Sequence, residues 1–262
     1  MSMKPDDRLP RTDVPRWSRT VRYYASRFVV GAAIHLLFRV RVEGRENLPA
    51  GPALYCFNHL SWLDPFLLYA TLPLRPRLYF FGPKEEDLRH GPRNRAMYWT
   101  GTAVPYKPAK SDLLDVARRV EAVFQVGGVL AIAGEGRIHV GERELLEVQA
   151  GAAYFALRSG VPIVPIAING TSWLGMRRPL RVRIGRAIPV TGRATSDAVA
   201  SLTERIWAAL HDLVADAPEP GPPGRFGRWL TEVFNDWPEG SRVASAEVRG
   251  PSGILSREPG TE

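Results

Sequence analysis

Cysteine is almost absent from this sequence. Cys56 is the single cysteine among 262 residues. No disulfide can therefore form within the chain, and a metal site built from several cysteines is excluded. This cysteine usage fits a reducing compartment.

Long apolar runs are also missing. The longest one extends from Phe28 to Phe38 and is interrupted by His35. As a helix it would be about 16 Å long, roughly half of what a bilayer core requires, so we expect no transmembrane helix. Residues 1–16 contain neither an apolar core nor a small-residue cleavage site, and we expect no secretory signal there.

Lysine is scarce, although the chain is basic. The formal net charge is +8, and the only lysines are Lys4, Lys84, Lys107 and Lys110. An arginine excess indicates anionic partners such as phosphorylated substrates, anionic lipid or nucleic acid, unless it reflects an arginine-rich proteome. Nucleic-acid binding would require a basic patch with stacking aromatic side chains. We find no such module and expect no nucleic-acid partner.

Composition and periodicity divide the chain into four parts. Prolines and alternating charges predict a disordered arm over residues 1–15, and residues 16–38 have the spacing of an amphipathic helix. Residues 39–215 form the folded domain. Residues 216–262 contain a proline-rich linker, a short aromatic segment (225–237) that docks either on the domain or on a membrane, and a disordered tail.

The helix over residues 16–38 has one apolar face, from which Arg19 and Arg22 point away. The residues of this face are Trp17, Val21, Tyr24, Phe28 and His35. Two interpretations stay open: the face packs on the domain, or it lies in the headgroup region of a membrane. In the second case four arginines would meet anionic lipid, namely Arg16, Arg19, Arg22 and Arg27.

Short apolar runs alternate with helical patterns over the folded domain. The expected strands are Arg39–Glu43, Ala53–Phe57, Arg77–Phe81, Ala103–Tyr106, Val129–Ala133, Ile163–Ile168 and Leu180–Ile184. Helices are expected to begin near Pro65, Glu85, Leu113, Gln149 and Ser196. This alternation predicts an α/β fold in which helices flank a mixed, mainly parallel sheet. Pro165, inside one of the runs, indicates an edge strand or an irregularity.

The pair His59 and Asp64 is the clearest chemical signal. Histidine takes up a proton near neutral pH, and a carboxylate bonded to its second ring nitrogen fixes the tautomer. On a straight helix the two would lie about 140° apart, so they can meet only across a turn. A strand end at Phe57 and a helix beginning near Pro65, with Asp64 or Ser61 as cap, supply that turn. Alternatively, Asp64 is a helix cap and His59 an incidental loop residue.

A second signal follows the apolar run over residues 128–133. Glu135, Gly136 and Arg137 stand at the expected carboxyl end of a strand, where open α/β folds bind ligands. Arginine at such a position is a candidate phosphate ligand, although a loop salt bridge would explain the same pattern.

Four segments together resemble the glycerolipid acyltransferase family, of the PlsC type that acylates 1-acyl-glycerol-3-phosphate. In the family's order, they are FNHLSWLD (57–64), TGTAVPYKP (100–108), AGEGRIHVGE (133–142) and SGVPIVPIAI (159–168). The resemblance spans roughly residues 40–190. Two departures are Lys107 in place of the usual arginine, and the absence of a threonine between Gly136 and Arg137.

The resemblance implies roles for individual residues. His59 would be the general base, and Asp64 would orient it. Glu135 and Gly136 would shape the acceptor site, and Arg137 and Lys107 would hold the acceptor phosphate. The full implied substrate-binding set is Asn58, Lys84, Lys107, Glu135, Gly136 and Arg137.

The resemblance also implies the partners. The donor would be acyl-CoA or acyl-carrier protein, the acceptor lysophosphatidic acid or a related lysophospholipid, and no metal or other cofactor would take part. The enzyme would be monotopic at the cytoplasmic face of a membrane.

Direct transfer from thioester to acceptor hydroxyl is the expected route, once a base has removed the hydroxyl proton. Cys56 is expected in the core and Ser61 as a helix cap, so neither is the preferred nucleophile. Two alternatives stay open: a lipid-binding protein of the same fold that has lost catalysis, and a thioesterase that uses water as acceptor.

Overall fold

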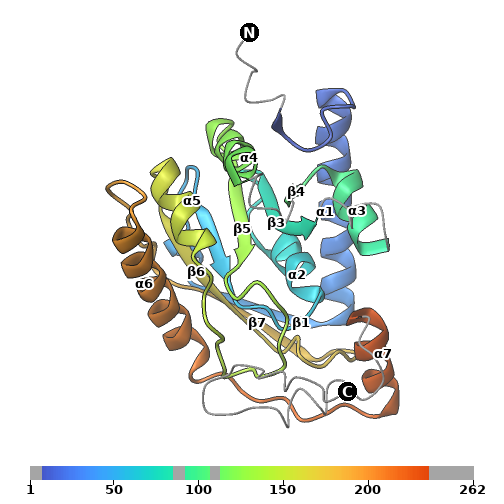
Figure 1. The fold of residues 1–262 in the computed structure, drawn as a ribbon. Coiled ribbons are helices and arrows are strands. Elements are labelled where there is room, and N and C mark those ends of the chain that lie inside the picture. Colours follow the sequence, from blue (N-terminus) through green and yellow to red (C-terminus); the bar gives the residue numbers. More distant parts are fainter. Residues whose placement is uncertain (1–7, 85–91, 107–112, 236–262) are drawn as a thin grey trace, which may run out of the picture.

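Seven strands form one mixed sheet in the computed structural model, which describes residues 8–84, 92–106 and 113–235 (Figure 1). The strands are β1 (Arg39–Glu43), β2 (Leu54–Phe57), β3 (Leu78–Lys84), β4 (Ala103–Tyr106), β5 (Val129–Ala133), β6 (Ile163–Asn169) and β7 (Pro179–Ile184). Their order is β1-β7-β6-β2-β5-β3-β4. Within the described residues, β6 and β7 are the one antiparallel pair. The expected α/β fold with a mainly parallel sheet is confirmed.

Helices cover both faces of the sheet (Figure 1). One face is covered by α4 (Leu113–Gln125), α5 (Gly151–Ser159) and α6 (Ser196–Val214). The other is covered by α1 (Arg16–Leu37), α2 (Leu63–Thr71), α3 (Pro92–Thr100) and α7 (Arg225–Asn235). Strand side chains alternate between the two faces, so that in β2 Cys56 points to the first and Phe57 to the second. The helix expected near Glu85 begins at Pro92, and residues 85–91 lie outside the described part.

β6 lies inside the sheet, so the edge-strand interpretation of Pro165 is wrong. The alternative of an irregularity fits. The β6–β7 ladder begins at Ile166, and the carbonyl oxygen of Pro165 accepts a hydrogen bond from the Gly185 N–H at 2.8 Å. Proline has no N–H to donate, and the ladder begins beyond it.

α1 turns its predicted apolar face outward. Trp17 and Phe28 are 71% and 79% exposed, whereas Arg19 and Arg27 are buried beneath the helix. The expectation that these two arginines meet anionic lipid is therefore wrong. Among the described helices, none combines the length and hydropathy needed to cross a bilayer.

Tyrosine rings explain how arginine comes to be buried under α1. The Arg27 guanidinium donates to the Leu72 carbonyl oxygen and lies 5.0 Å from the ring centroid of Tyr69. Arg77 lies 4.6 Å from the ring centroid of Tyr23. Burial lowers the pKa of Arg27, and the aromatic faces offset part of that cost through cation–π attraction.

The two ends of the described chain are more ordered than the composition indicates. Residues 8–14, predicted as part of a disordered arm, form turns, because Leu9 is buried in the core. At the other end, α7 docks on the domain through Leu230 and Phe234. The Leu174 N–H donates to Thr231 Oγ1 of this helix at 2.8 Å.

Candidate active site

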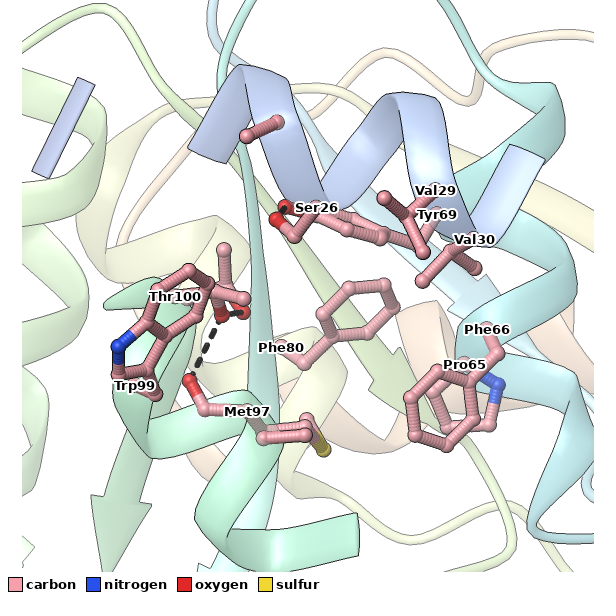
Figure 2. A pocket seen from close by; sticks show the side chains of 13 residues that line it. Ser26, Val29, Val30, Pro65, Phe66, Tyr69, Phe80, Met97, Trp99 and Thr100 are labelled. Carbon is pink, nitrogen blue, oxygen red and sulfur yellow. Dashed lines mark hydrogen bonds between the residues drawn. The ribbon is translucent and has the colours of Figure 1, made fainter. Parts of the chain in front are cut away.

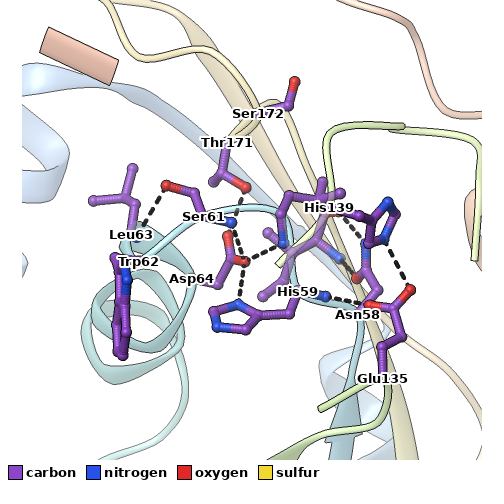
Figure 3. A network of polar contacts seen from close by, with 12 residues as sticks. Asn58, His59, Ser61, Trp62, Leu63, Asp64, Glu135, His139, Thr171 and Ser172 are labelled. Carbon is purple, nitrogen blue, oxygen red and sulfur yellow. Dashed lines mark hydrogen bonds and ion pairs between the residues drawn. The ribbon is translucent and has the colours of Figure 1, made fainter. Parts of the chain in front are cut away.

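The turn between β2 and α2 brings His59 and Asp64 together (Figure 3). His59 Nδ1 lies 2.9 Å from Asp64 Oδ2. The same oxygen accepts hydrogen bonds from the N–H groups of Leu60, at 2.7 Å, and Ser61, at 2.9 Å. The chain thus folds around the carboxylate, as the turn hypothesis requires.

Asp64 is completely buried, and its second oxygen is also used. The Thr171 hydroxyl donates to Oδ1 at 2.6 Å. An ionised carboxylate accepts from all of these donors. With the Nδ1 hydrogen of His59 directed to Asp64, Nε2 is left as the basic nitrogen, on a side chain that keeps 11% exposure.

Asn235, at the end of α7, holds the turn from the side. Its Oδ1 accepts from the Ser61 hydroxyl at 3.0 Å and from the Trp62 N–H at 2.9 Å. The Ser61 oxygen in turn accepts from the Leu63 N–H at 3.2 Å. The N-cap of α2 is Trp62, so the prediction that Ser61 or Asp64 caps this helix is wrong. Asn235 could not be predicted as part of the site, because it lies 174 positions from Ser61 and no local pattern connects the two.

Asn58 has a structural place in the sheet. It is fully buried; Nδ2 donates to the Ile168 carbonyl oxygen at 3.0 Å, and Oδ1 accepts from the Ile168 N–H at 2.7 Å. Both ends of the amide are therefore occupied by β6. This buried amide joins β2 to β6, and substrate binding by Asn58 stays a prediction.

Glu135 supports the turn from the end of β5 (Figure 3). Its Oε2 accepts from the His59 N–H and its Oε1 from the Leu146 N–H, both at 2.8 Å. His139 Nε2 lies 2.8 Å from Oε1 in an ion-pair contact that lacks hydrogen-bond direction. Glu135 is 3% exposed and contacts the turn through the His59 N–H, and its predicted part in shaping the acceptor site stays a prediction. Gly136 follows with φ of 67°, a left-handed conformation that favours glycine.

A second buried glutamate, Glu142, holds the loop after β6. Its Oε2 accepts from the Gly170 N–H at 2.8 Å and its Oε1 from the Ser172 N–H at 3.1 Å. Burial, together with the nearby Asp64 charge, raises the pKa of Glu142. Thr171, the residue between these two donors, is the one that bonds to Asp64, so Glu142 positions part of the Asp64 environment.

Of the three predicted cationic ligands, the structure describes Arg137 and the backbone of Lys84. Arg137 is exposed on the loop after β5. Lys84 ends β3, which runs parallel to β5, so their backbones reach the same edge of the sheet; the Lys84 side chain and the whole of Lys107 lie outside the described part.

An apolar cavity of about 260 Å³ lies between α1, α2 and α3, above β3 (Figure 2). Val29 and Val30 line it from α1, and Pro65 and Phe66 line it from α2. Because Pro65 directly follows Asp64, the cavity begins at the helix turn that carries the His59–Asp64 pair. Its lining can accommodate a hydrocarbon chain but offers little to a charged ligand.

Known proteins resemble the chain in sequence. Residues 39–169 match the Acyltransferase family. The 1-acyl-sn-glycerol-3-phosphate acyltransferase of Saccharomyces cerevisiae is 29% identical over 187 residues, which cover 68% of this chain and 60% of that protein. The chloroplastic 1-acyl-sn-glycerol-3-phosphate acyltransferase BAT2 of Brassica napus is 27% identical, covering 60% and 44%. The lyso-ornithine lipid O-acyltransferase of Pseudomonas aeruginosa is 30% identical, covering 62% and 58%. The chain thus spans about half the length of these curated relatives.

A solved structure resembles the fold. The crystal structure of the 1-acyl-sn-glycerophosphate acyltransferase PlsC from Thermotoga maritima aligns with a TM-score of 0.57, over 79% of this chain and 87% of that chain. Sequence identity is 17%, so the comparison supports the architecture and not the substrate.

Proposed function

The chain belongs to the acyltransferase family, and we propose that it transfers a fatty acyl group from an acyl thioester to the free hydroxyl of a lysolipid. The donor is acyl-CoA or acyl-carrier protein. The acceptor is lysophosphatidic acid or a related lysolipid, in phospholipid biosynthesis. The observation that carries the proposal is the His59–Asp64 pair at the edge of the sheet, next to an apolar cavity.

His59 is the general base in this mechanism. His59 Nε2 takes the proton of the acceptor hydroxyl while the hydroxyl oxygen attacks the thioester carbonyl. The ester C–O bond forms, the C–S bond breaks, and the proton passes from the imidazolium to the leaving thiolate. Asp64 fixes the tautomer through Nδ1 and stabilises the imidazolium between these steps.

The acyl group passes directly to the acceptor, without an acyl-enzyme. Cys56 is completely buried, and burial raises the pKa of its thiol, which disfavours the nucleophilic thiolate. The Ser61 hydroxyl donates to Asn235 rather than to a base. Neither side chain is activated for attack.

The proposal includes two subsites near His59. The apolar cavity takes a hydrocarbon chain, and Arg137 and Lys84 at the sheet edge hold the acceptor phosphate, with Lys107 in the same role by family resemblance. The outward apolar face of α1 attaches the enzyme to the cytoplasmic face of a membrane as a monotopic protein. That face carries Trp17, Val21 and Phe28.

An acceptor screen with a labelled acyl thioester tests the proposal. Wild type and His59→Ala are compared with lysophosphatidic acid, lyso-ornithine lipid, a phosphate-free monoacylglycerol and no acceptor, and the products are identified. Ester formation on a lysolipid that His59→Ala abolishes supports the proposal. Thioester cleavage that does not depend on acceptor would identify a thioesterase. Lipid binding without any turnover would identify a protein that has lost catalysis.

A further inference from the structure

The outer side of α7 carries an apolar stripe that the described part of the chain leaves exposed. Phe226, Trp229 and Val233 are 62%, 55% and 54% exposed. Their spacing of three and four residues places them on one face of the helix. Arg225 and Arg228 are exposed on one side of this stripe.

The inner side of the same helix reaches the catalytic turn. Asn235 bonds to Ser61 and Trp62, two residues of the turn that joins His59 to Asp64. The helix therefore has its apolar stripe facing solvent and its opposite side against the active site.

The end of α1 lies beside this surface. The Arg177 N–H donates to the Leu37 carbonyl oxygen at 2.6 Å, and this bond joins the end of α1 to the loop on which α7 packs. Leu36 and Met176, on the two sides of that junction, are 72% and 62% exposed. Exposed apolar residues thus lie on the end of α1 and on the loop beside it, and α7 packs on the same loop.

We infer that the outer face of α7 docks on a phospholipid bilayer and sets the catalytic turn at the lipid surface. Aromatic residues beside arginines are typical of interfacial helices, because the rings enter the headgroup region and the guanidinium groups meet anionic lipid. The charge pattern and the net charge of +8 complement an anionic surface. The inference rests on the proposed function in one respect: a lysolipid acceptor must reach His59 from a bilayer.

Vesicle co-sedimentation of the full-length protein tests this docking. The vesicles contain equal parts of phosphatidylcholine and phosphatidylglycerol. Phe226→Ser/Trp229→Ser should bind them at least about tenfold more weakly, because two aromatic side chains no longer leave water. Trp207→Ser is the matched control: Trp207 is a 39% exposed aromatic residue of α6, on the opposite face of the sheet, and its loss should leave binding unchanged.

A charge variant keeps the test decisive if the double variant does not fold. Arg225→Glu should weaken binding to the anionic vesicles and leave binding to pure phosphatidylcholine vesicles unchanged. Unaltered binding by every α7 variant overturns the inference. So does a concentration-dependent dimer that these variants abolish while vesicle binding persists, because the face would then be a self-association surface.

Failure of docking and failure of the proposed function are separate results. Vesicle binding is measured without substrate. A double variant that binds vesicles at least about tenfold more weakly but acylates a soluble short-chain lysolipid at the wild-type rate is the expected result. A protein that docks through α7 and acylates nothing would refute the proposed function alone.

Discussion

Asp64 and Glu142 are both buried carboxylates at the same end of the sheet, and both accept main-chain N–H groups, but Asp64 has two further side-chain partners, His59 and Thr171. Asp64 meets a histidine ring whose other nitrogen remains free to act on a substrate. Glu142 meets main-chain N–H groups of the loop after β6. In the proposed mechanism, the same functional group orients a base in one region, whereas in the other it holds a loop. This contrast predicts that substitutions in the first region change rate, whereas those in the second change stability or positioning.

The largest effect is expected at His59. His59→Ala should lower kcat by roughly 10²–10⁴-fold, because the proton acceptor is lost. The melting temperature should stay near wild type, because Asp64 Oδ2 keeps its hydrogen bonds from the Leu60 and Ser61 N–H groups. Asp64→Asn should also lower kcat strongly, since an amide cannot stabilise the imidazolium. Turnover is measured with donor and acceptor at saturation. Near-normal turnover by His59→Ala would rule out the mechanism.

Asn235 tests whether a neutral side chain outside the family segment positions the turn. Asn235→Ala should lower kcat about tenfold with little change in KM, because Ser61 and Trp62 lose their shared acceptor and the base shifts. Asn235→Asp keeps an acceptor oxygen and should recover most of the rate. If both variants lose stability equally and neither changes kcat, Asn235 is merely part of the packing of α7.

Arg137 should affect binding rather than rate. Arg137→Ala should raise KM for a phosphorylated acceptor by roughly three- to tenfold, because an exposed guanidinium contributes a partly screened, charge-assisted contact. KM for a phosphate-free acceptor should not change. Arg193→Ala, at another exposed arginine, is the control. A rise in the donor KM alone would show that the two subsites are reversed.

The parts that could be predicted from the sequence are local. Apolar runs of strand length locate the strands, because a strand inside the domain needs apolar side chains and these stand together in the sequence. His59 and Asp64 are five positions apart, and the strand end and the helix start on either side indicate the turn that joins them.

The parts that could not be predicted depend on contacts between residues far apart in the sequence, or on a helix whose buried side contains arginine. Thr171 and Asn235 reach the turn from 107 and 174 positions away, and no periodicity encodes such pairs. The orientation of the α1 arginines is predicted wrongly for a different reason. Amphipathic reasoning assumes that arginine faces water, whereas Arg27 stacks on Tyr69 beneath the helix.

The smallest effect on turnover is expected at Glu142. The pH dependence of the free energy of unfolding there tests the contrast with Asp64. The pKa of Glu142 is raised above the ordinary 4.5 by burial and by the Asp64 charge. The folded state therefore favours the protonated form, and the resulting stability is fully present below pH 4.5 and is lost as pH rises through the raised pKa. Glu142→Gln does not titrate but gives up one acceptor, a cost of about 1 kcal/mol.

The free energy of unfolding of wild type minus that of Glu142→Gln should consequently decrease from pH 5 to pH 8, as measured by urea denaturation. The wild-type advantage is largest at the acid end, because a protonated Glu142 carries no buried charge. Glu219→Gln, at an exposed glutamate, should give a difference that does not change with pH in this range. Turnover by Glu142→Gln should stay within a fewfold of wild type, since the loop is still held by its remaining hydrogen bond. A difference that stays flat with pH, together with a loss of kcat as large as that of Asp64→Asn, would place Glu142 with the catalytic pair and end the distinction between the two carboxylates.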